Sequence, residues 1–574
     1  MKGTNSQTGW VLVASLLCGL VGGASGQETE APQSIFSEVL DVRVVNVEIV
    51  VTDRDGVRVS GLEAEDFELL VDGEPTTIDY FSEIQGGRVM QLAEDAADVE
   101  LPGSFAPGQE VGTSYLVFID DQFSIARDRN RVLDRMEEDL ARLGENDRMA
   151  IVSFDGRELS MLNSWTRSPR VLERSFREAR AKRTFGLQRM AELNTNDRER
   201  RDRSLLATTT DTFLMRAGQE PNESVTRHLN PIEWHYANRL EEQLSRSVSA
   251  AVASLRSFAS PPGRKVMLIL ASNWPLSPAA YTVASYDGSF EDIGWASLDN
   301  AISGGGALYG SLTDTANLLG YTVYPVDVPG IARMMVGAEV GAPDAFSGAG
   351  ELRNGGMFVR ERITHDGLHY IATATGGEAL INSDRDVAFA RVVADTRSYY
   401  WLGFSPDRKE DDLGHDIEVK VRRKGYTVRS RNGFHDFSRQ TESTMMVESS
   451  LFFGNPPSSV PLDLSFGKPR RAGRGKVIIA LDVGIPMDSV TLIPVQGKLR
   501  ADLEIRVTVM DEDGARSDTP MATIRIEGET APSPGQMFHY ETTLTLRRRK
   551  HRVIVAVNDP VSGIMMSSST ELSP

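Results

Sequence analysis

The stretch Ser114-Tyr115-Leu116-Val117-Phe118-Ile119-Asp120-Asp121 decides the fold of this chain. Its apolar run from Tyr115 to Ile119 is typical of a strand buried on both faces of a parallel sheet. Two aspartates follow directly, and open α/β sheets bind their ligands at the carboxyl ends of such strands. The stretch therefore predicts an α/β domain with a candidate site immediately after this strand.

Farther along the chain, apolar patterns alternate between helix and strand. Residues 132–143 repeat at helical spacing and stop at Gly144, and a second buried strand is indicated at 149–154. The alternation continues with helices and strands at 168–179, 231–258, 265–271, 312–319, 321–327 and 368–374. This pattern predicts a domain at 113–400 with a doubly wound, mostly parallel, Rossmann-like sheet and right-handed crossovers.

Three stretches interrupt this alternation. Residues 182–230 are rich in arginine and too polar for a core, so they are expected to form an exposed insertion. Residues 274–310 and 329–362 are glycine-rich or irregular, and they are expected to form further insertions.

The sequence on either side of the α/β domain indicates β structure. Residues 35–85 alternate as short strands around turn signals and predict a small N-terminal β module. Residues 86–112 carry no periodicity and predict a linker. A β extension at 401–440 and a C-terminal β-sandwich within 441–574 are predicted from further strand-like runs.

The N-terminus has the pattern of a secretory signal peptide at 1–26. An apolar run from Trp10 to Val21 precedes small residues up to Gly26, and the run is shorter than the roughly 20 residues of a membrane-spanning helix. We therefore expect an exported protein, periplasmic or extracellular, with no membrane span in its mature chain. Cleavage would also remove Cys18, the only cysteine, which excludes disulfides and a thiol nucleophile.

The charge balance bears on possible partners. The formal net charge is -19, with 81 acidic against 62 basic residues. Wrapping a nucleic acid requires a basic face that displaces phosphate counterions, so no nucleic-acid partner is expected.

Several motifs together resemble the von Willebrand factor A domains, and in particular the bacterial exported proteins called VWFA-related. The resemblance covers residues 40–435 and rests on the segments Val47–Phe81, Leu116–Asp121, Asp147–Phe154, Ala372–Gly377 and Tyr399–Phe404. It implies an A-type α/β domain that binds a partner at the carboxyl rim of its sheet.

Members of that family hold a divalent cation at this rim through Asp-x-Ser-x-Ser, a Thr and a later Asp, and a partner's carboxylate completes the shell. Here Asp120 and Ser124 match, while Gln122 replaces a Ser, and Ser272-Asn273 stand where an Asp is expected. The resemblance implies a degenerate site for Mg²⁺ or another divalent cation, or for none, with Asp120, Ser124 and Thr166 as the metal ligands.

The same resemblance implies a function and a ligand-binding rim. We expect an exported, non-catalytic protein of the binding or adhesion type that engages a protein or a cell-surface ligand. The expected rim residues are Asp121, Gln122, Trp165, Ser272, Asn273 and Trp274.

Two other functions stay open from the sequence. A secreted hydrolase could use rim carboxylates such as Asp120 and Asp155 as acid and base. A structural envelope component would instead have its rim blocked by the insertions. The sequence thus predicts where the site lies and leaves its ligand open.

Overall fold

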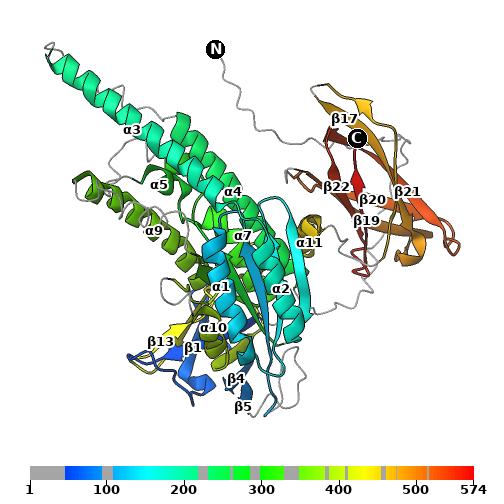
Figure 1. Ribbon diagram of the computed structural model, residues 1–574. Coiled ribbons are helices and arrows are strands. Elements are labelled where there is room, and N and C mark those ends of the chain that lie inside the picture. Colours follow the sequence, from blue (N-terminus) through cyan, green and yellow to red (C-terminus); the bar gives the residue numbers. More distant parts are fainter. Residues whose placement is uncertain are drawn as a thin grey trace. The chain divides into compact units, whose positions relative to one another are not determined.

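The computed structural model describes residues 45–92, 108–216, 231–258, 263–284, 298–328, 348–381, 387–406, 411–453, 460–473, 475–512 and 516–574 (Figure 1). The chain divides into two compact units. The first comprises Val45–Phe404 with Lys409–Ser438, and the second contains Arg439–Pro574. The predicted signal peptide at 1–26 lies outside the described residues.

A five-stranded sheet of parallel and antiparallel strands lies at the centre of the first unit. Its order is β10 (Tyr321–Asp327), β9 (Arg264–Ala271), β6 (Thr113–Asp120), β7 (Arg148–Phe154) and β8 (Leu159–Thr166). The pairs β10–β9, β9–β6 and β6–β7 are parallel, and the edge strand β8 pairs with β7 in antiparallel direction. Because the four parallel strands share one direction, their carboxyl ends meet at one edge of the sheet.

Helices bury both faces of this sheet. The alternate residues Tyr115, Val117 and Ile119 of β6 form one hydrophobic cluster with apolar side chains of α1 (Ala126–Glu138), α2 (Pro169–Ala181) and α10 (Ala388–Thr396). Successive strand residues point to opposite faces. Leu116 and Phe118, which are also fully buried, therefore face the other side, where α4 (Pro231–Ser257) and α7 (Gly306–Leu319) contact the strands.

The predicted insertions contain helices that the sequence analysis did not anticipate. Residues 182–230 include α3 (Gly186–Arg216), and 274–310 include α5 (Pro278–Val283), whose residues are all buried. The helix α9 (Gly348–Ala374) begins inside the predicted insertion at 329–362. The expectation of an exposed insertion was wrong for the start of α3, where Leu193 and Asn196 are buried. Asp197 is buried beside them, and its carboxylate accepts two hydrogen bonds from Arg360, both at 2.7 Å, which compensates its burial.

In two antiparallel sheets, strands from the start of the first unit's sequence pair with strands from its end. Their orders are β13-β1-β11-β4-β5 and β14-β12-β2-β3. The strands are β1 (Val45–Thr52), β2 (Phe67–Val71), β3 (Glu74–Thr76), β4 (Tyr80–Gln85), β5 (Arg88–Leu92), β11 (Tyr399–Phe404), β12 (Gly414–Val421), β13 (Thr427–Arg429) and β14 (Gly433–His435). The stretch 401–440 is thus no separate extension, because its strands pair with N-terminal ones. The predicted linker 86–112 likewise begins with a strand.

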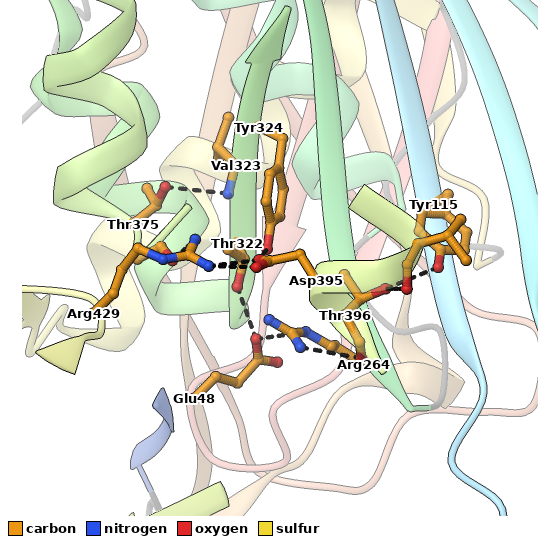
Figure 2. A network of polar contacts seen from close by, with 12 residues as sticks. Glu48, Tyr115, Arg264, Thr322, Val323, Tyr324, Thr375, Asp395, Thr396 and Arg429 are labelled. Atoms are coloured by element: carbon orange, nitrogen blue, oxygen red, sulfur yellow. Dashed lines mark hydrogen bonds and ion pairs between the residues drawn. The ribbon is translucent and has the colours of Figure 1, made fainter. Parts of the chain in front are cut away.

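A buried polar network joins the first of these sheets, which contains β1, β11 and β13, to the amino ends of the parallel strands (Figure 2). Arg264 begins β9 and is almost completely buried, and its guanidinium carbon lies 4.1 Å from the ring centre of Tyr399. Arg264 Nε lies 2.9 Å from Oε2 of Glu48 in β1, and Thr322 Oγ1 donates to the same oxygen at 2.8 Å. The ion pair therefore holds β1 against the first residues of β9 and β10.

Asp395, in α10, is the second centre of this network. Its carboxylate accepts hydrogen bonds from Arg429 at 2.6 and 2.7 Å, and also from Arg58 and Tyr324. Burial opposes ionisation, but the guanidinium groups of Arg429 and Arg58 outweigh it and hold the pKa of Asp395 below its usual range. Since Arg429 ends β13 and Arg58 follows β1, one carboxylate ties two antiparallel segments to the α/β part.

The second unit packs two antiparallel sheets on one core. One sheet holds β15 (Asp463–Phe466), β16 (Arg470–Arg471), β17 (Lys476–Pro486) and β21 (Met537–Arg547). The other holds β18 (Ile493–Val495), β19 (Lys498–Asp511), β20 (Met521–Gly528), β22 (His551–Asn558) and β23 (Met565–Leu572). Both sheets contribute to one hydrophobic cluster. The helix α11 (Arg439–Phe453) packs Val447 and Leu451 against Ile554.

Candidate functional site

Asp120 is the last residue of β6 and is fully buried at the carboxyl end of the parallel strands. Its Oδ2 accepts a hydrogen bond from Trp274 Nε1 at 2.6 Å, and its Oδ1 accepts one from the backbone amide of Gln122 at 2.9 Å. Burial raises the pKa of Asp120 to about 7, against the opposing effect of these two hydrogen bonds. Both carboxylate oxygens are therefore bonded to protein donors.

The two other residues of the sequence motif also make internal hydrogen bonds. Ser124 is fully buried, and its hydroxyl donates to the backbone carbonyl of Asp120. Gln122 is almost fully buried, and its Nε2 donates to the carbonyl oxygen of Gln243 in α4 at 3.0 Å. The structure thus brings Asp120, Gln122 and Ser124 together, with their polar groups turned toward the protein.

Asp121 is fully buried beside Asp120 but makes a separate set of contacts. It forms an ion pair with Arg129 of α1, and Ser153 Oγ donates to its Oδ2 at 2.6 Å. Arg129 Nη2 also donates to the carbonyl oxygens of Arg180, in the last turn of α2, and of Lys182, just after that helix, at 3.0 and 3.2 Å. Burial raises the pKa of Asp121, while Arg129 opposes that rise. Asp121 is therefore a partner of an internal cation and not a surface ligand.

The loop after β9 places Ser272, Asn273 and Trp274 at the same end of the sheet. All three are buried, and the Trp274 ring stacks on Tyr309 with centres 6.0 Å apart. Asn273 has a φ of 61°, a left-handed conformation that Asn tolerates better than most residues. Ser272 Oγ finds no hydrogen-bond partner among the described residues. The side chain of Trp274 thus covers the carboxylate of Asp120 and donates a hydrogen bond to it.

The predicted placement of Trp165 and Thr166 at this rim was wrong. Both lie at the end of β8, and because β8 is antiparallel, Thr166 pairs with Met149 at the start of β7. Asp120 pairs with Phe154 at the other end of β7, roughly 16 Å away along the strand. Thr166 Oγ1 accepts the amide of Ser168 before α2. Neither residue can take part in a site with Asp120.

Segments from the predicted insertions close the rim from outside. Two backbone amides at the start of α3 donate to carbonyl oxygens of the rim. The amide of Phe185 donates to the carbonyl of Asp121 at 2.9 Å, and the amide of Gly186 donates to the carbonyl of Ser124 at 3.0 Å. Helix α9 approaches the loop after β9, where the amide of Leu276 donates to the carbonyl of Ile363 at 2.9 Å. These contacts leave no signal in the sequence, because backbone groups make them.

Several oxygen atoms at this rim already make hydrogen bonds within the protein, whereas Gln122 Oε1 and Ser272 Oγ make none among the described residues. Mg²⁺ requires hard oxygen atoms with free lone pairs directed at one point. Both oxygens of Asp120 accept protein hydrogen bonds, and Ser124 Oγ donates to a carbonyl. Among the described residues, no three His, Cys, Asp or Glu side chains gather where an ion could bind.

The paired carboxylates of the hydrolase alternative occupy different settings. Asp120 is fully buried, whereas Asp155 lies in the turn after β7 and its Oδ1 accepts the backbone amides of Arg157 and Glu158, both at 2.8 Å. Asp155 thus stabilises its own turn. The geometry offers no open pair of carboxylates built from these two residues.

Gly186→Ala tests the closing contact of α3. An added Cβ would lie 2.5 Å from the carbonyl oxygen of Ser124, so the start of α3 must move. We expect a loss of about 1–3 kcal/mol in the free energy of unfolding, together with faster hydrogen exchange of the Phe185 and Gly186 amides. Gly310→Ala in α7 is the control, because its Cβ would meet its nearest atom at 3.6 Å. Equal exchange rates in wild type and Gly186→Ala would contradict the proposed closure.

Comparisons with known proteins identify no family. No protein-family model matches the chain, and no curated protein matches it. Similar solved structures include a beta-glucuronidase of Bacteroides uniformis, at 11% identity and TM-score 0.15, covering 31% of this chain. This chain spans only 19% of that protein.

Two further structures cover more of the chain. An aerotolerance-related membrane protein of Bacteroides fragilis matches 50% of this chain and 100% of its own, at 11% identity and TM-score 0.21. Three N-terminal domains of the type V pili tip protein Mfa5 of Porphyromonas gingivalis match 92% of this chain and 77% of their own, at 9% identity and TM-score 0.21. At these scores the likenesses carry no argument, so the von Willebrand factor A class stays a prediction.

Within the described parts of the chain, no helix combines the length and the apolarity that crossing a bilayer requires.

Proposed function

We propose that this chain is an exported, non-catalytic binding or scaffold protein whose A-type rim has become part of its core. In this proposal the rim no longer takes a divalent cation, and partners bind to other surfaces. The observation that carries it is the setting of Asp120, which is fully buried with each oxygen bonded to a protein donor.

The surroundings of Asp120 support the same proposal. Ligand recognition at a metal rim requires an open outer face, and here α3 and α9 contribute backbone contacts that cover it. A buried carboxylate that lost its donors would be strongly unfavourable, so the hydrogen bonds from Trp274 and from the Gln122 amide to Asp120 have a structural role. A structural envelope component is the second candidate, and the closed rim favours it over a hydrolase.

Calorimetry of the full chain with Mg²⁺ and Mn²⁺ tests the proposal. We expect negligible saturable heat for the wild type and for Asp120→Asn, because Trp274 and the Gln122 amide already bind the two side-chain acceptor atoms of Asp120 inside the protein. Asp120→Asn keeps an acceptor for the Gln122 amide, which makes it the matched control. A saturable heat in the wild type that disappears in Asp120→Asn would overturn the proposal that the rim takes no divalent cation. Turnover of a peptide or glycan that this variant abolishes would support a hydrolase.

A further inference from the structure

Two turns of the second unit carry an unusual concentration of positive charge. Residues 468–476 read Lys-Pro-Arg-Arg-Ala-Gly-Arg-Gly-Lys, and residues 547–552 read Arg-Arg-Arg-Lys-His-Arg. Each turn holds five Lys or Arg and no Asp or Glu, in a chain whose formal net charge is -19. This local excess of cations therefore runs against the composition of the whole protein.

The fold places these two turns side by side. Strand β17 lies between β16 and β21, with Arg471 paired to Val477 and Lys476 paired to Arg547. The backbone amide of Arg548 donates to the carbonyl of Gly475 at 3.1 Å, which joins the turns directly. We define the basic edge as the described residues Lys468, Arg470, Arg471, Lys476, Arg547, Arg548, Arg549 and Lys550.

Part of the basic edge is neutralised by acidic neighbours. Lys550 Nζ lies 2.6 Å from Glu571 Oε2, and Arg547 Nη1 lies 3.6 Å from Asp511 Oδ2. Four further members are exposed, and no acidic side chain of the described residues pairs with them: Lys468, Arg470, Arg471 and Arg548. Their charges are therefore available to a ligand.

This arrangement also places two like charges next to each other. Lys476 and Arg547 stand directly opposite each other in an antiparallel pair, where like charges are unfavourable. Charges on an edge strand prevent pairing with other chains, but Lys476 begins β17, which lies between β16 and β21 and is not an edge strand. The density of cations on the basic edge thus exceeds what protection of the edge requires.

We propose that the basic edge is a binding surface for an anionic polysaccharide with spaced carboxylate groups. Arginine guanidinium groups bind carboxylates through paired hydrogen bonds, which suits the three exposed arginines, and Lys468 adds a fourth positive charge. This surface lies in the second unit, so it is independent of the closed rim and goes beyond the proposed function.

Two other polyanions fit the basic edge less well. Single-stranded nucleic acids need aromatic side chains for stacking, and neither turn contains one other than His551. A duplex carries a dense line of phosphate charge, and tight binding to it requires more phosphate contacts than the four exposed cations supply. Binding to a lipid surface is strengthened by inserted apolar side chains, and the only apolar residues of the turns are Pro469 and Ala472. A polymer of lower charge density remains the best match.

Binding of the full chain to polygalacturonate tests this proposal, with neutral dextran as the blank. We expect saturable binding to polygalacturonate that weakens as salt is raised. The triple variant Arg470→Gln, Arg471→Gln and Arg548→Gln should raise the Kd about tenfold, because it removes three exposed ionic contacts.

A second triple variant controls for the change in net charge. Arg170→Gln, Arg174→Gln and Arg177→Gln removes three exposed arginines of α2, in the other unit, and should leave the Kd unchanged. Equal weakening in both triple variants would overturn the proposal, as would absence of binding by a wild type with a normal circular dichroism spectrum. Tighter binding to phosphatidylglycerol vesicles or to DNA than to polygalacturonate would also overturn it.

Discussion

Asp395→Ala is expected to lower the free energy of unfolding of the first unit by about 3 kcal/mol. The carboxylate lies between Arg58 and Arg429 and also accepts the hydroxyl of Tyr324. Its removal leaves two guanidinium groups near each other in a largely buried place, with only part of their charge exposed to water. Urea unfolding of the full chain measures the loss.

Two variants separate this effect from a general loss of packing. Asp395→Asn keeps the shape and one acceptor but removes the charge, so we expect a smaller loss than for alanine. Glu138→Ala breaks the exposed ion pair with Arg135 in the same unit and should leave the unfolding midpoint unchanged. An unfolding midpoint of Asp395→Ala equal to that of the wild type would contradict the role assigned to this carboxylate.

The pKa of Asp395 gives the same prediction a pH dependence. The pKa of Asp395 is lower in the folded than in the unfolded state. Its ionised carboxylate therefore contributes fully to the stability of the fold above the unfolded pKa of about 4, and this contribution is lost as the pH falls through the folded pKa. The wild type should therefore lose stability more steeply than Asp395→Asn when the pH falls below about 4.

The buried strands were predictable because their signal is local. Strands β6, β7, β9 and β10 form where continuous apolar runs indicate them, and each is buried along nearly its whole length. The antiparallel sheets were not predictable in the same way. Strand β1 pairs with β11, more than 300 residues later, and no periodicity reveals a partner so distant. The sequence therefore predicts residues 35–85 and 401–440 as separate segments, although their strands share one hydrophobic core.

The sequence predicts the position of the candidate site, but it does not predict that the site is covered. Residues 120–124 and 272–274 do meet at the carboxyl ends of the parallel strands, as the alternation of elements indicates. The sequence could not show that β8 is antiparallel, which moves Thr166 to the opposite end. It also could not show that backbone amides at the start of α3 cover the rim, since such donors exist in every residue except proline.

Trp274→Ala is expected to cost about 3–5 kcal/mol. The side chain is fully buried against Tyr309, so its truncation leaves a cavity, and the carboxylate of Asp120 loses its donor. Trp274→Phe should cost less, because it keeps most of the ring and removes only the N–H group. Thermal unfolding of the two variants and the wild type measures both contributions.

The same two variants decide why the rim excludes a cation. If Trp274 alone excluded it, its truncation would open the rim and Mg²⁺ would bind. We expect no saturable Mg²⁺ heat in either variant, because Ser272 and Asn273 offer no carboxylate and Thr166 lies at the far end of β7. A saturable heat in Trp274→Ala, absent from the wild type, would show instead that the ligand set is intact and only covered. The closed rim would then be a gated metal site, and the proposed structural role of Asp120 would fall.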